Sequence, residues 1–115
     1  MSDDCIFCKI AAKEMNADIV FQDDDVIAFR DINPQAPTHV LVIPKRHITN
    51  PNDLVEGDDA LIGKIVRTGK DIAAKEGLAK NGYRLVFNSG EDAGYSVLHV
   101  HLHVLGGRKM EWPPG

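Results

Sequence analysis

The sequence lacks the features that would assign it to a membrane, secretory or nucleic-acid-binding class. Its apolar runs all fall short of the roughly 18 residues that span a bilayer. The first residues, Met1–Asp4, carry neither the basic start nor the long apolar stretch of a secretory signal, so we expect a cytoplasmic protein. With 13 basic against 17 acidic residues, the net charge of -4 provides no general basic field for DNA or RNA. We therefore expect any phosphate to be bound locally, by a few donors.

Cysteine is scarce as well, because the chain has two, Cys5 and Cys8, in a C-x-x-C pair. In a reducing compartment such a pair is more typical of a metal site or a redox element than of a structural disulfide. Two reduced thiols that pack as small apolar side chains are the simpler alternative. The pair by itself leaves these interpretations open.

The order of the periodic segments predicts a single α+β domain over residues 1–115. Apolar residues at helical spacing indicate one long helix over 58–76 and a short N-terminal helix over 6–14. Alternating or β-branched runs indicate five strands, at 18–22, 26–30, 38–43, 83–88 and 97–105. Because the strands follow one another with one long helix between them, we expect a mainly antiparallel sheet. The tail over 106–115 ends in Trp112-Pro-Pro-Gly and is expected to be extended.

Three of the five histidines alternate with apolar residues near the end of the chain. His99, His101 and His103 are separated by Val100 and Leu102, and successive side chains of a strand point to opposite faces. A strand over 97–105 would therefore carry imidazoles on one face and aliphatic side chains on the other. We expect it to aim all three rings into one cleft.

Two kinds of chemistry compete for this row. Two imidazoles on one face of a strand can bind zinc with an open position for water, as in a metallohydrolase. Alternatively, one imidazole attacks phosphorus while its neighbours donate hydrogen bonds to phosphoryl oxygens, because the pKa of histidine lies near neutrality. The preceding loop favours the second interpretation, since its glycines let backbone N–H groups turn toward an anion and Asn88 and Ser96 offer neutral donors. We expect a nucleotidyl transferase or hydrolase.

The run His99-Val-His-Leu-His-Val-Leu resembles the H-φ-H-φ-H-φ-φ signature of the histidine triad superfamily, in which φ is apolar. The similarity extends through residues 29–39 and 41–47 to 105–115, and these segments resemble the Hint branch, the purine nucleoside phosphoramidases. The resemblance implies a HIT-like fold and a homodimer whose sheet continues from one subunit into the other. It also implies cleavage of the P–N bond of AMP- or GMP-type phosphoramidates through a covalent nucleotidyl-histidine intermediate, without a catalytic metal.

The resemblance further implies roles for individual residues. His101, the middle member of the triad, matches the nucleophile, and His39 matches a fourth active-site histidine. Asp31 matches the carboxylate that accepts hydrogen bonds from the ribose hydroxyls. The phosphate contacts match Asn88, Ser96 and His103, and the apolar walls around the base match Ile6, Phe7, Ile10, Phe29, Ile32 and Leu41.

Two features depart from the branch. Tyr95 stands where many members carry glutamine, so an amide contact to phosphate or leaving group would be missing. The Cys5/Cys8 pair resembles the cysteine pair of histidine triad relatives in which two cysteines and two histidines bind zinc. The matching histidines here are His47 and His99. A Cys₂His₂ set fills a tetrahedral shell, so the implied ion would be structural and would pin the N-terminal helix to the sheet.

Three alternatives to the phosphoramidase stay open at this point. A dinucleoside polyphosphate hydrolase would use the same nucleophile, a metallohydrolase would be stopped by chelators, and a nucleotide- or zinc-dependent interaction module would bind AMP without chemistry. The tail is open too, because Trp112 either packs as an anchor or belongs to a C-terminus that reaches the partner subunit's site.

Overall fold

The computed structural model describes residues 4–95 and 97–115. Its main elements are α1 (Ile6–Ala11), β1 (Ile19–Gln22), β2 (Val26–Arg30), β3 (Thr38–Pro44), α2 (Asp59–Lys75), β4 (Tyr83–Phe87) and β5 (Leu102–Gly106). Single 3-10 turns lie at Pro51–Asp53, Glu56–Asp58 and Glu91–Ala93. The strands form one antiparallel sheet in the order β1-β2-β3-β5-β4. The predicted α+β class, with about five antiparallel strands, one long helix and a short N-terminal helix, is confirmed.

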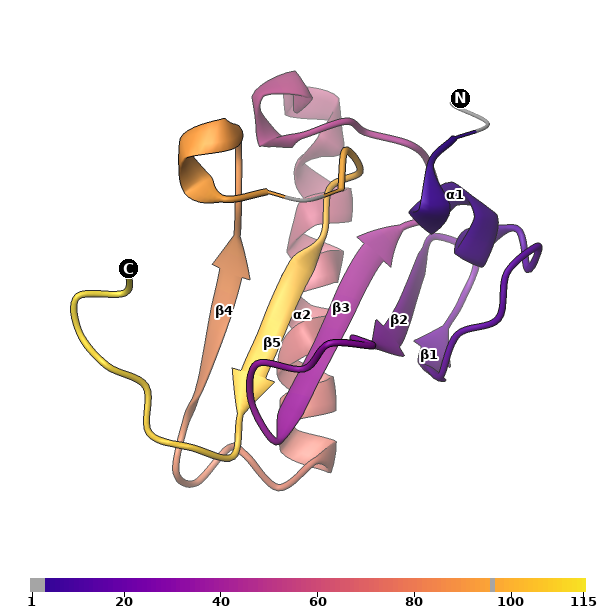
Figure 1. Cartoon of the computed structure of the whole chain (residues 1–115). Helices are drawn as coiled ribbons and strands as arrows, with labels where there is room; N and C mark the ends of the chain where they lie inside the picture. The colour runs from indigo at the N-terminus through magenta and orange to yellow at the C-terminus, as the bar shows by residue number, and fades with distance from the viewer. Residues whose placement is uncertain (1–3, 96) are drawn as a thin grey trace.

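The alternation of side chains along the strands builds a core on each face of the sheet. One face packs against α2, which lies behind the sheet in Figure 1, through Val26, Ala28, Val40, Val42, Leu102 and Val104. The other face carries Ile27, Phe29, Leu41 and Ile43, which cluster with Cys5, Phe7, Cys8 and Ile10 of the α1 region. A helix of only six residues is marginal by itself, so burial of its apolar side chains is what stabilises α1.

The last strand is shorter than predicted. β5 begins at Leu102, so residues 97–101 lie outside the sheet and only His103 of the triad lies in a strand. The preceding segment bonds elsewhere, since the N–H of Val100 donates to the carbonyl oxygen of Ile48 at 2.7 Å, in the loop after β3. The expectation of one continuous strand over 97–105 is therefore wrong for its first half.

Both ends of the chain differ from regular structure. α1 ends at Ala11 rather than at residue 14, because Lys13 has a φ of 62°, outside the helical region. Residues 107–115 contain neither helix nor strand and run beside β4 (Figure 1), where the Arg84 guanidinium donates to the carbonyl oxygen of Glu111 at 2.8 Å. Within the described ranges, none of the helices combines the length and apolar character needed to cross a membrane.

Candidate active site

The histidine row divides between two sites instead of lining one cleft. His99 is fully buried, and its Nδ1 lies 3.3 Å from the Sγ of Cys5 and 3.5 Å from that of Cys8. The rings of His101 and His103 face each other with 4.9 Å between centroids, and both line an apolar cavity that His99 does not reach. The expectation that all three rings share one cleft is therefore wrong for His99. The chain before β5 is irregular there, so strict alternation does not hold for its side chain.

Within the described residues, His101 makes a hydrogen bond through one of its two ring nitrogens. Its Nδ1 lies 2.7 Å from the carbonyl oxygen of His99, and because a carbonyl can only accept, Nδ1 carries the proton. The lone pair of the neutral ring is thus on Nε2. The ring is 6% exposed, and burial lowers its pKa, an effect that the bond to the His99 carbonyl and the charge of Asp31 oppose. A neutral imidazole with a free Nε2 is a competent nucleophile.

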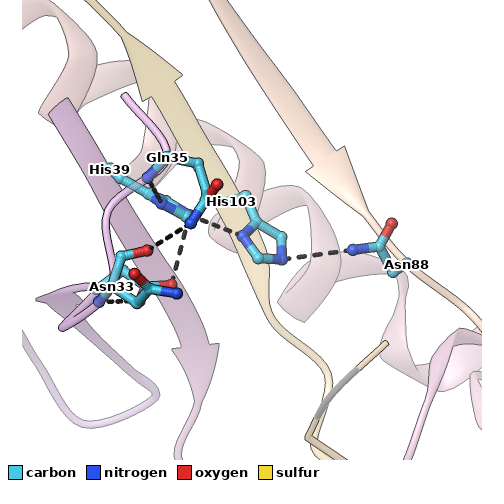
Figure 2. A network of polar contacts seen from close by, with 6 residues as sticks. Asn33, Gln35, His39, Asn88 and His103 are labelled. Atoms are coloured by element: carbon cyan, nitrogen blue, oxygen red, sulfur yellow. Dashed lines mark hydrogen bonds and ion pairs between the residues drawn. The ribbon is translucent and has the colours of Figure 1, made fainter. Parts of the chain in front are cut away.

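A second histidine pair extends the site toward β4 (Figure 2). Nε2 of His39, on β3, lies 2.9 Å from Nδ1 of His103, on β5, and 3.5 Å from a carboxylate oxygen of Asp31. Nε2 of His103 lies 3.5 Å from the Asn88 amide, just beyond β4. Burial lowers the pKa of His39, opposed by Asp31, and burial lowers the pKa of His103 to about 4. Both rings are therefore neutral at pH 7.

The cavity beside these rings has a volume of about 310 Å³. Its walls include the residues predicted to contact the base and Asp31, the carboxylate predicted to bind the ribose. The predicted base-contacting residues are Ile6, Phe7, Ile10, Phe29, Ile32 and Leu41. The edge of the Phe7 ring approaches His101, with 5.1 Å between centroids, and Ile32 is 96% exposed at the rim. An apolar cavity that opens onto imidazoles and one carboxylate suits a flat aromatic ligand with polar groups at one end.

Of the two phosphate donors predicted in the loop before the triad, Asn88 is among the described residues. Asn88 does not line the apolar cavity but borders a neighbouring one of about 280 Å³, which His39 and His103 share. Ser96 lies outside the described residues. Gly90 and Gly94 have φ angles of 87° and 80°, so the loop does use the left-handed conformations that glycine permits.

Sequence reasoning missed several residues of the site. Met15, Asn16, Ala17, Arg30 and Val97 also line the apolar cavity. The first three lie between α1 and β1, a segment without any motif, so nothing in the sequence could have placed them. In the described part of the chain, the Ser89 hydroxyl oxygen is buried without a hydrogen-bond partner, next to Asn88. The position of Ser89 in the glycine-rich loop was the sequence signal that could have singled it out.

A separate cluster of sulfur and nitrogen atoms joins α1 to the loop after β3. The ligand atoms of Cys5, Cys8, His47 and His99 all lie within 4.8 Å of one another. Cys5 is the N-cap of α1 and accepts the N–H of Cys8, while Nδ1 of His47 lies 3.2 Å from the Sγ of Cys8. Burial, and then the neighbouring Cys5, raises the pKa of the Cys8 thiol to about 11, so this thiol is protonated at pH 7 in the metal-free protein.

The donors of this cluster fit a tetrahedral zinc ion. Two thiols and two imidazoles are the set that structural zinc sites use. His99 also has the outer bond such ligands need, because its Nε2–H donates to the carbonyl oxygen of Pro44 at 2.8 Å and leaves the Nδ1 lone pair facing the thiols. Nε2 of His47 is similarly held, 3.3 Å from the hydroxyl of Thr49. The cluster could therefore hold a metal ion.

Comparisons with known proteins agree with this architecture. The purine nucleoside phosphoramidase of Escherichia coli strain K12 is 46% identical over 110 residues, which are 96% of this chain and 92% of that protein. An uncharacterized HIT-like protein of Synechococcus elongatus is 52% identical over 115 residues, the whole of both chains. The crystal structure of a HIT family hydrolase from Legionella pneumophila superimposes with a TM-score of 0.96 at 54% identity, covering 97% of this chain and 100% of that one.

The family match itself covers most of the chain. The HIT domain matches residues 12–110, a range that includes the whole sheet, α2 and the three histidines of the triad. A histidine triad protein from Clostridium difficile shares the fold with a TM-score of 0.93 and 40% identity, over 96% of each chain. The chain belongs to the HIT domain family.

Proposed function

We propose that this protein hydrolyses the P–N bond of purine nucleoside 5′-phosphoramidates through a covalent nucleotidyl intermediate on His101. The observation that carries the proposal is the hydrogen bond of 2.7 Å from His101 Nδ1–H to the His99 carbonyl, which leaves Nε2 free beside the apolar cavity. The 46% identity with an E. coli purine nucleoside phosphoramidase supports the substrate class.

The reaction has two displacements at phosphorus. In the first, the Nε2 lone pair of His101 forms a bond to phosphorus while the P–N bond to the amine breaks; the amine leaves with that electron pair and takes a proton from solvent. In the second, water attacks phosphorus and gives up a proton to solvent, the bond to Nε2 breaks with its electron pair returning to the ring, and AMP or GMP is released with His101 restored. The enzyme must chiefly hold phosphorus in line with Nε2 and stabilise charge on the equatorial oxygens. The first step uses no metal ion.

The remaining residues of the site take binding roles in this proposal. Asp31 accepts hydrogen bonds from both ribose hydroxyls, which an ionised carboxylate can do because it has two acceptor oxygens. His103, Asn88 and Ser96 contact the phosphate. The base lies between the apolar side chains of the cavity, formed by Phe7, Ile10, Phe29, Ile32 and Leu41.

The decisive experiment compares substrates and looks for the intermediate. We expect the protein to hydrolyse adenosine 5′-phosphoramidate much faster than a diadenosine polyphosphate, and acid-free quenching followed by mass spectrometry to find AMP on His101. Faster turnover of the diadenosine polyphosphate would reassign the activity. AMP binding without turnover of either substrate would instead indicate a nucleotide-dependent interaction module.

We also propose that the Cys5, Cys8, His47 and His99 cluster holds structural zinc. When bound, the ion would cross-link α1 to the segment before β5 and to the loop after β3, and it would take no part in the reaction. Two reduced cysteines in this role suit a reducing compartment, so we place the protein in the cytoplasm. Metal analysis of the purified protein should find close to one zinc per chain; below about half an equivalent without chelator treatment would contradict the site.

The assembly we propose is a homodimer of single domains, each spanning residues 1–115, with the tail over 106–115 close to the partner's site. Among the described residues β4 is an edge strand that pairs only with β5, so a second copy would pair along its other edge. Trp112 is 83% exposed and available for such a contact. Sedimentation equilibrium should give twice the mass of the chain; a monomer at micromolar concentration would contradict the proposal.

A further inference from the structure

A chain of hydrogen bonds runs from the loop before β3 through two histidines to the end of β4 (Figure 2). The main-chain N–H of Gln35 donates to Nδ1 of His39 at 3.0 Å. Nε2 of His39 then meets Nδ1 of His103 at 2.9 Å, and Nε2 of His103 meets the Asn88 amide at 3.5 Å. A main-chain N–H can only donate, whereas each imidazole nitrogen either donates or accepts. The donor at Gln35 therefore determines which nitrogen of His39 carries the proton, and His39 in turn determines which nitrogen of His103 does.

The first link determines His39. Because Nδ1 accepts from Gln35, it carries no proton, so the proton of the neutral ring is on Nε2. That proton points at Nδ1 of His103, which accordingly accepts. The proton of neutral His103 is then on Nε2, so His103 is a donor at the edge that reaches both cavities.

The last link sets the amide of Asn88. Oxygen and nitrogen of a side-chain amide exchange places by a half turn, and the network around them decides which one faces a partner. The structure places the Asn88 amide nitrogen 3.5 Å from Nε2 of His103, but an N–H on Nε2 requires an acceptor. The proton assignment therefore predicts the half-turned amide, with its oxygen facing the ring. A phosphoryl oxygen that replaces Asn88 as the acceptor would use the same His103 proton.

We propose that the main-chain N–H of Gln35 is a positioning group that fixes the proton of His39 on Nε2 and thereby makes His103 a hydrogen-bond donor. His39 then acts by orienting His103 and does not transfer its proton during the reaction. Passing its Nε2 proton to His103 would leave His39 with no ring proton at all, a form that imidazole reaches only in strong base. This inference rests on the proposed function only for its kinetic readout.

The surroundings hold Gln35 and His39 in place. The Gln35 carbonyl accepts from Nε of Arg108 at 3.0 Å, and this main-chain contact remains when the side chain is removed. The exposed Gln35 side chain makes a separate hydrogen bond to the Asn33 carbonyl at 3.0 Å. The ionisable groups facing His39 are Asp31, after β2, and His101 and His103, before and on β5; Arg84 and Arg108 line the cavity that it borders. Burial lowers the pKa of His39, in keeping with a ring whose second nitrogen is already used as an acceptor.

The same proton assignment bears on metal binding. The ligand atoms of Asp31, His39 and His103 lie within 4.8 Å of one another, as a metal site would require. A metal at this position would need the lone pair of His39 Nε2, but that nitrogen carries the proton while Gln35 holds Nδ1. We therefore assign the three residues to a hydrogen-bonded group, which zinc added beyond one equivalent should not occupy.

The direct test is imidazole nitrogen NMR on the wild-type protein at pH 7. Long-range proton–nitrogen correlations, assigned with His→Gln variants, should show His39 and His103 protonated on Nε2 and His101 protonated on Nδ1. His101 is an internal control because its carbonyl partner imposes the opposite tautomer. A proton on Nδ1 of His39, or a charged His39 at pH 7, would overturn the proposal whether or not the protein is a phosphoramidase.

A matched pair of variants separates the main-chain group from the side chain. Gln35→Pro removes the N–H, whereas Gln35→Ala keeps it and removes only the amide side chain. In Gln35→Pro we expect His39 to bind a proton about tenfold more tightly and the Nε2 tautomer to lose its dominance. Gln35→Ala should match the wild type in both measurements. Equal proton affinity of His39 in both variants would contradict the proposal, and if Gln35→Pro does not fold, the wild-type spectra still decide.

The kinetic readout follows the same pair. The acid limb of kcat/KM should move to higher pH in Gln35→Pro and stay in place in Gln35→Ala, because without the N–H that occupies its Nδ1, His39 binds its second proton at higher pH. A merely structural role for Gln35 would lower the rate at every pH without moving the limb. Absence of turnover in the wild type would end the proposed function but would leave the tautomer spectra as the test of this inference.

Discussion

His99 and His103 stand four residues apart on the same stretch of chain, and burial is the main cause that lowers the pKa of each to about 4. Their partners differ completely. His99 turns its Nδ1 to two thiols of the α1 region, whereas His103 turns its Nδ1 to another imidazole and its Nε2 to an amide. The same residue type with the same titration behaviour thus suits a metal ligand at one end of the row and a phosphate donor at the other. The comparison teaches that the partners of each ring assign its role.

The largest test of this division removes the nucleophile between the two ends. His101→Ala should lower kcat by about 10⁴-fold or more, since the covalent route is lost, while AMP affinity stays within a few-fold. Zinc content should not change. Val97→Ala, in the same cavity, is the matched control and should keep its rate within about fivefold. Hydrolysis by His101→Ala at the wild-type rate would refute the assignment.

The second test removes a ligand from the metal end. Cys8→Ser should bring bound zinc below half an equivalent and lower the free energy of unfolding by about 3 kcal/mol, because metal that binds only the folded state stabilises it. His103→Gln, at the other end of the row, should keep its zinc. Denaturation of both variants with and without a chelator measures the difference. Equal stability of Cys8→Ser and wild type at saturating zinc would show that the cluster holds no structural ion.

The third test uses the titration of His103, whose pKa falls from the ordinary 6.5 to about 4 on folding. A histidine with a lowered pKa binds protons more readily when unfolded, so its stabilisation is complete above pH 6.5 and is lost as the pH falls toward 4. Between pH 7 and 5 the chelator-treated wild type should therefore lose about 1 to 2 kcal/mol more of unfolding free energy than His103→Gln. Parallel pH curves for the two proteins would contradict this prediction.

The smallest effect is expected at Phe7, whose ring lies edge-on to His101 at 5.1 Å and to His99 at 6.0 Å between centroids. Phe7→Leu keeps an apolar side chain but removes the aromatic contact in the nucleotide cavity. We expect AMP affinity to fall about fivefold, since such contacts contribute about 1 kcal/mol, and zinc affinity to stay unchanged. Calorimetric titration with each ligand measures both. An equal loss of zinc affinity would show that the two ends are coupled through this ring.

Much of the fold and of the site followed from residue types and their spacing. Alternation over 97–105 predicted that Leu102 and Val104 lie on the face away from His103, and both pack in the core under α2. The apolar positions Phe7, Ile10 and Leu41 do line the cavity. The extent of β5 did not follow, because the Val100 N–H bonds to Ile48 in a distant loop instead of continuing the ladder. Periodicity describes a strand only where a neighbouring strand pairs with it.

Gln35 shows why other parts of the site were beyond sequence reasoning. The group that acts is its main-chain N–H, which every residue except proline has, so the side chain gives no signal. Residues 15–17 also gave no sequence signal, because they line the cavity only as a result of the course that the chain takes between α1 and β1. Such contributions depend on where the backbone lies, and no residue type or spacing in the sequence indicates them.

The sequence by itself determined the order and type of the elements and the kinds of donor available: three alternating histidines, a pair of cysteines and a carboxylate at Asp31. The tertiary structure alone decided which imidazole meets thiols, which meets a carbonyl and which meets another imidazole. The physical reason is that the two neutral forms of a histidine ring differ little in energy. The partner that packs against each nitrogen therefore selects where the proton resides. As a result, Nε2 of His101 carries a lone pair and Nε2 of His103 carries a proton to donate.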